Sequence, residues 1–170
     1  MQYMQKGGFQ SNPMMRLTLG FTTLLLVGFV VSNFTIYFSK MGLTPDSVIA
    51  YYNGSEEDFR PARTFGSMIE VTHGHLPVMA MLILMLTHLV IFSPLTKTQK
   101  IVLISVSFLS ALLDEGSGWL VRFVHPDFAW LKIISFLTLQ ASLIFLLIFL
   151  SSFLIRTPPM PETKYVENDL

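Results

Sequence analysis

The chain has 170 residues, of which 52% are hydrophobic and only 13% are charged, and its formal net charge is zero. This composition is typical of a membrane protein rather than a soluble domain, and the balanced charge gives no basic surface for nucleic acid. The sequence contains no cysteine, which excludes disulfides, thiolate-held iron–sulfur clusters, c-type haem attachment and zinc–thiolate sites.

Four apolar runs predict four membrane-spanning helices. About 20 apolar residues cross the hydrocarbon core, where the backbone must form its own hydrogen bonds. We therefore expect an all-α membrane protein, a four-helix transmembrane bundle built as one domain over residues 1–156. Its spans are predicted at residues 16–39, 68–93, 99–123 and 130–155. The polar, proline-rich tail, residues 157–170, is predicted to be disordered.

The first connection, residues 39–66, is predicted to contain a short helix. Thr44 and the proline after it match an N-cap and a first helical position, and Gly54 matches a helix end. Tyr51 and Tyr52 between these signals are typical of a membrane interface. The pattern indicates a short interfacial helix over the mouth of the bundle, acting as a lid or as a packing and anchoring element.

The positions of lysine and arginine favour an orientation with both termini in the cytoplasm. The basic residues on that side are Lys6, Arg16, Lys97, Lys100, Arg156 and Lys164. The loop of residues 39–66 then faces outward, and a bacterial inner membrane is the expected location.

Polar residues of all four spans fall at a similar depth. Helix rise places Asn33, His75, Asp114, Glu115 and Gln140 roughly 8–12 Å below the outer ends of their helices. A charge in hydrocarbon costs several kcal/mol, so the adjacent carboxylates Asp114 and Glu115 indicate a functional site. The alternative is a structural hydrogen-bond network that holds the helices together.

The start of the second span combines a capping signal with two histidines. Ser67 and Glu70 match a capping box with Ser67 as N-cap. Glu70 and His73 are three residues apart and share a face, whereas His75 points almost the opposite way. Pro77 predicts a kink that would bring His73 and His75 closer together.

The first hypothesis for this layer is a b-type haem. Axial imidazoles from two helices hold haem iron, and the pair here would be His73 or His75 with His125. Arg122, together with Arg63, would meet the haem propionates, because guanidinium groups suit carboxylates. His88 lies alone near the opposite face, where we expect it to contact a backbone carbonyl or a lipid headgroup.

The second hypothesis is a non-haem metal or proton site. Imidazole and carboxylate ligands bind iron, copper or zinc. The candidate ligands are His73, His75, Asp114, Glu115 and Glu70. The same groups would alternatively relay protons or hold a quinone headgroup.

The sequence as a whole predicts a small integral membrane subunit with a His/carboxylate site near the outer face. A haem b electron-transfer subunit is the favoured function. The alternatives are a non-haem metal-binding or proton-coupled membrane protein and a purely structural subunit. No complete catalytic centre is evident, so we expect a non-catalytic subunit of a membrane redox complex. Its expected partners are the lipid bilayer, other membrane or periplasmic subunits, and quinone.

Overall fold

A computed structural model describes residues 13–93 and 95–156 of the chain, and the tail predicted to be disordered lies outside them. Within this part the chain is almost entirely helical and contains no strand, only an isolated bridge between Ser55 and Arg60. The elements are α1 (Pro13–Lys40), α2 (Pro45–Asn53), α3 (Phe65–Ile91), α4 (Lys97–Phe123), the 3-10 turn η3 (Pro126–Phe128) and α5 (Ala129–Arg156).

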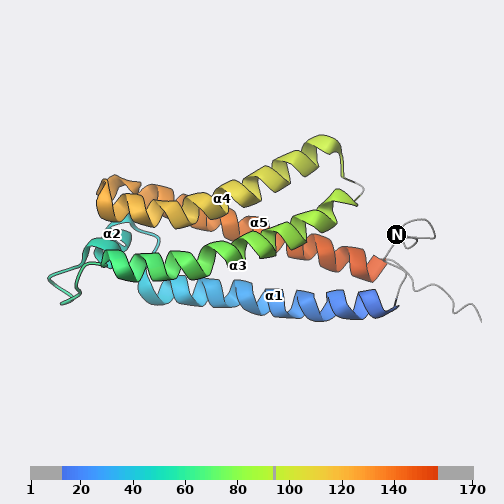
Figure 1. The fold of residues 1–170 in the computed structure, drawn as a ribbon, viewed down its shortest axis with the longest axis horizontal. Coiled ribbons are helices and arrows are strands. Elements are labelled where there is room, and N and C mark those ends of the chain that lie inside the picture. The colour runs from blue at the N-terminus through green and yellow to red at the C-terminus, as the bar shows by residue number, and fades with distance from the viewer. Residues whose placement is uncertain (1–12, 94, 157–170) are drawn as a thin grey trace, which may run out of the picture.

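Four of the described helices are long enough and apolar enough to cross a membrane. Each has 27 or 28 residues, which corresponds to about 40 Å of helix against a hydrocarbon core of about 30 Å. The prediction of an all-α, four-helix transmembrane bundle is confirmed. The start of α1, the α3–α4 connection and the end of α5 lie at one end of the bundle (Figure 1). The short helix α2 lies at the other end, which we call the α2 end.

Local signals explain where the helices begin. Thr44 is the N-cap of α2 and Gly54 is its C-cap, as the sequence predicts. The predicted cap of α3 is wrong, because Thr64 and not Ser67 is the N-cap. The Thr64 hydroxyl accepts a hydrogen bond from the backbone N–H of Ser67 at 3.1 Å. Glu70 therefore has no capping role and is exposed. A capping box does occur on α4, between Thr96 and Gln99.

Helix α5 is the centre of the bundle and packs against α1, α3 and α4. More than half of the residues in its apolar span are buried, whereas only 6% of those in the span of α1 are buried. Helices α4 and α5 both carry small buried residues, which let helix backbones approach closely. These residues are Ser107, Ser110 and Ser117 on α4 and Ser135 and Ser142 on α5.

Helix α2 closes the α2 end of the bundle. Val48 and Tyr52 of α2 are buried in an apolar cluster with Val121 of α4 and Phe136 of α5. The Nδ2 amide of Asn53 also donates a hydrogen bond to the Val121 carbonyl at 3.4 Å. The short helix is thus part of the folded core, and it covers the end of the bundle where the polar residues lie.

Candidate functional site

The neighbouring carboxylates of α4 face two different helices. Successive residues of a helix point about 100° apart, so Asp114 and Glu115 cannot share one partner equally. Asp114 faces α5, where the Lys132 ammonium donates to its Oδ1 at 2.7 Å and to its backbone carbonyl at 2.8 Å. The Lys132 side chain is only 9% exposed and that of Asp114 19%. The two residues form a buried ion pair between α4 and α5.

Glu115 faces α3 and ends a chain of polar contacts. Its Oε1 accepts a hydrogen bond from the Thr72 hydroxyl, and its Oε2 lies 3.4 Å from Nδ1 of His75. The Thr72 oxygen in turn accepts a hydrogen bond from the indole N–H of Trp119 at 2.9 Å. Glu115 is 17% exposed while the His75 side chain is 64% exposed. The imidazole is therefore the open end of a network whose carboxylate is largely enclosed.

Tyr52 of α2 lies beside the buried pair. A Cβ atom on Gly118 would come within 2.6 Å of the Tyr52 hydroxyl, so only glycine leaves room for the ring. Burial raises the pKa of Tyr52, and the positive charge of Lys132 opposes this effect. Tyr52 is therefore a neutral phenol at physiological pH, and it closes the Lys132–Asp114 pair from the α2 side.

The charges of these residues do not balance without His75. Counting Asp114 and Glu115 as carboxylates and Lys132 as an ammonium gives two negative charges and one positive charge. A proton on His75 would bring this sum of −1 to zero. In an apolar medium this imbalance gives the site a specific affinity for one more positive charge.

Two members of the predicted polar layer stay outside the network. Gln140 is buried, and its Oε1 finds no hydrogen-bond partner among the described residues. Asn33 is half-buried, and within the described ranges neither carboxylate contacts it. Of the other members of the predicted layer, His75 contacts the acidic pair, through Glu115. Sequence reasoning missed Lys132 as the partner of Asp114. The sequence feature that could have predicted this partner is the carboxylate inside a span, because such a group needs a cation on a facing helix.

The other predicted ligands are not gathered around one point. His73 and Glu70 are exposed on α3, and neither makes a hydrogen bond or ion pair within the described part of the chain. Nδ1 of His125 lies 3.3 Å from both the backbone nitrogen and Oδ2 of Asp127, so this histidine caps η3. The Arg122 Nε donates to the backbone carbonyl of Arg63 at 2.7 Å.

Over residues 13–93 and 95–156 no three His, Asp or Glu side chains are placed to hold one metal ion. The lone His88 sits edge-on to the Phe92 ring, with 5.3 Å between ring centroids. The haem and metal ligand sets remain predictions. Among their histidines, His75 is the one whose ring nitrogen contacts a largely buried carboxylate, that of Glu115.

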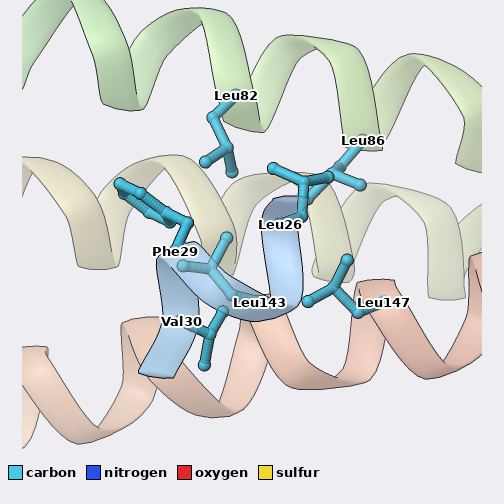
Figure 2. A pocket seen from close by; sticks show the side chains of 7 residues that line it. All are labelled: Leu26, Phe29, Val30, Leu82, Leu86, Leu143 and Leu147. Atoms are coloured by element: carbon cyan, nitrogen blue, oxygen red, sulfur yellow. The ribbon is translucent and has the colours of Figure 1, made fainter. Parts of the chain in front are cut away.

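A pocket elsewhere in the bundle is apolar. It lies between α1, α3 and α5, and is lined by leucine, valine and phenylalanine side chains (Figure 2). The lining residues are Leu26, Phe29, Val30, Leu82, Leu86, Leu143 and Leu147. None of them can bind a metal or exchange a proton, so this pocket is part of the packed core and not of the polar site.

The four spans and the polar groups enclosed between them define a small integral membrane protein of the helical-bundle class. The chain belongs to the Aq_1264_TM family, described as a transmembrane helical domain, whose model matches residues 42–161. The Lys132–Asp114 and His75–Glu115 pairs and their hydrogen-bond partners Thr72 and Trp119 all lie inside this matched region. Comparison with curated proteins and with solved structures found no match.

Proposed function

We propose that this protein is a proton-coupled membrane subunit in which His75 and Glu115 bind and release one proton. The observation that carries the proposal is the contact of an exposed imidazole with a largely buried carboxylate, 3.4 Å apart, inside a membrane span. Imidazole changes charge near neutral pH, and because the ring is exposed on the surface of the bundle, a partner within the membrane can reach it. The enclosed carboxylate stabilises the protonated ring.

The Lys132–Asp114 pair has a supporting role in this proposal. Lys132 is buried and fixed by two hydrogen bonds, so its charge cancels that of Asp114 and does not change during proton exchange. The negative charge of Glu115 is then left for His75 alone. Thr72 and Trp119 orient the carboxylate through their hydrogen bonds, which leaves the proton on the imidazole side.

The exchange partner in this proposal is another subunit of a membrane complex or a quinone. His75 lies ten residues into α3, about 15 Å from the start of the helix, and thus at hydrocarbon depth. A partner that reaches the ring there must itself be at home in the membrane. A transmembrane subunit and a quinone headgroup both meet this requirement.

Haem b bound through His75 is the second candidate function. Imidazoles that bind metals almost always donate their other ring N–H to a carboxylate or carbonyl, and the contact between Nδ1 and Glu115 is of this kind. Nε2 would then be the iron ligand. The same nitrogen would serve a non-haem transition metal. His73 and His125 do not contact His75, so a second axial ligand would come from a partner chain.

Two pairs of matched variants test the proton proposal. Protein with isotope-labelled histidine is reconstituted in lipid nanodiscs, and the imidazole signals are followed by NMR across pH 4 to 9. The signal lost in His75→Gln identifies the residue, and His73→Gln is the control because that side chain has no partner among the residues that the structure describes. We expect Glu115→Gln to shift the titration midpoint of His75 and the exposed control Glu70→Gln to leave it unchanged. An identical midpoint in wild type and Glu115→Gln would contradict the proposal.

The absorption spectrum of the same purified protein decides the second candidate. Protein from haem-replete cells that binds haem through His75 shows a Soret band that His75→Gln abolishes and His73→Gln preserves. A wild-type protein that is colourless and in which metal analysis finds no iron, copper or zinc would contradict the haem and metal hypotheses and leave only the proton site.

A further inference from the structure

Four basic residues near the α2 end have no carboxylate partner. They are Lys40 at the end of α1, Arg60 and Arg63 in the α2–α3 connection, and Arg122 in the last turn of α4. The ion pairs of the described residues involve Glu115, Asp127 and Asp114, and none of them includes these four cations. Among the described residues, no carboxylate therefore lies within ion-pair distance of these four cations, although Glu56, Glu57 and Asp58 precede Arg60 in the same loop.

Two of these cations are held in place by the protein. Nε of Arg122 donates to the Arg63 carbonyl at 2.7 Å, and Nη2 of Arg63 donates to the Tyr51 hydroxyl at 2.7 Å. The Arg63 guanidinium also lies over the Tyr51 ring, 4.4 Å from its centroid, and that of Arg122 lies 5.3 Å from the centroid of Phe123. Each guanidinium has five N–H donors, so most donors on both remain unused after these contacts.

Their position matches the headgroup layer of a bilayer. Arg63 precedes the first residue of α3 and Arg122 lies one residue before the end of α4. The spans exceed the hydrocarbon core by about 10 Å in total, so their ends reach about 5 Å beyond it. Phe65, Trp119 and Phe123 pack together on the same helix ends, with ring centroids 5.3 to 6.2 Å apart. Aromatic residues of this kind are typical of the membrane interface.

We propose that Arg63 and Arg122 bind the phosphate of an anionic phospholipid. Guanidinium groups form charge-assisted, often bidentate hydrogen bonds with phosphate, and these two are already oriented by protein contacts. The aromatic group of Phe65, Trp119 and Phe123 gives the adjoining acyl chains an apolar surface. Trp119 also belongs to the hydrogen-bond chain of Glu115, but the printed contacts of Arg63 and Arg122 involve neither Glu115 nor His75, so the phosphate site does not depend on the proposed proton function.

The test is the affinity for phosphatidylglycerol, measured by native mass spectrometry of the detergent-solubilised full chain with phosphatidylcholine as the comparison lipid. A basic residue near an anionic surface contributes about a fivefold factor in affinity, so we expect Arg63→Gln/Arg122→Gln to bind phosphatidylglycerol roughly 30-fold more weakly. Arg60→Gln removes one positive charge from an exposed loop residue and should alter affinity less than twofold. Arg63→Lys/Arg122→Lys keeps both charges without the planar donors. Its affinity for phosphatidylglycerol should fall between that of wild type and that of Arg63→Gln/Arg122→Gln.

Three results would overturn the proposal. One is equal affinity for phosphatidylglycerol in wild type and in both double variants; the lysine variant keeps this result informative if the glutamine variant does not fold. Another is saturation of the site by millimolar inorganic phosphate with full displacement of the lipid, which would indicate a free-anion site. The last is loss of a co-purifying protein subunit from the glutamine variant with lipid affinity unchanged, which would indicate a protein interface.

Discussion

Removing either partner of the Lys132–Asp114 pair should destabilise the bundle far more than removing both. Lys132→Met keeps the length of the side chain and removes the ammonium, which leaves the Asp114 carboxylate facing α5 without a counter-charge. Asp114→Leu leaves the buried ammonium with only the backbone carbonyl of residue 114. The double variant replaces both groups by apolar side chains of similar size.

The expected magnitude follows from the burial of the pair. Lys132 and Asp114 are 9% and 19% exposed, and the ammonium makes two hydrogen bonds to residue 114 at 2.7 and 2.8 Å. Breaking a buried pair by removing one member costs about 3–5 kcal/mol, whereas replacing the whole pair by apolar groups is often neutral or stabilising. Each single variant should thus lose about 3 kcal/mol or more, and the double variant should lie close to wild type.

Unfolding in mixed micelles with increasing dodecyl sulfate, followed by circular dichroism, measures these free energies. Lys97→Met is the matched control, because that lysine is exposed at the start of α4, and its effect should stay within about 0.5 kcal/mol. A loss under about 1 kcal/mol in Lys132→Met would refute the reasoning. So would a double variant whose loss equals the sum of the two single losses, because the two groups would then be independent.

Three further predictions concern the α2 end. Burial raises the pKa of Tyr52, so above about pH 10 the unfolded chain loses a proton that the folded chain keeps, and the free energy of unfolding should fall with rising pH. In an unfolding series at alkaline pH, this fall should be smaller in Tyr52→Phe than in wild type. Equal falls in the two proteins would contradict the prediction. Gly118→Ala should cost about 1–3 kcal/mol in the same micelle assay because its methyl group meets the Tyr52 ring, whereas Gly116→Ala, with open space around it, should be neutral or stabilising by up to about 1 kcal/mol. Reporter fusions at Asn53 and Thr98 should lie on opposite sides of the membrane, and a common side for both would contradict the four-span topology.

The elements of this protein could be predicted from its sequence because a bilayer leaves the backbone few alternatives. Long apolar runs must become helices there, so the length of each run fixes a span to within a few residues. The short helix α2 follows from local chemistry, with Thr44 and Gly54 at its two ends. Helix rise also places His75 and Glu115 at a common depth, and the structure brings these two residues into contact.

Only the tertiary structure decided which side chains meet. Depth along a helix does not state which neighbouring helix a residue faces, because a rotation of 100° separates Asp114 from Glu115. The close packing of α4 on α5 turns Asp114 toward Lys132, and the position of α3 brings Thr72 and His75 to Glu115. His125 was predicted as an axial ligand from its place at the outer end of a span, but the chain after α4 turns there and uses it to cap η3. Side-chain packing between helices is non-local, so the pattern of a single helix predicts that a polar group needs a partner and not which residue supplies it.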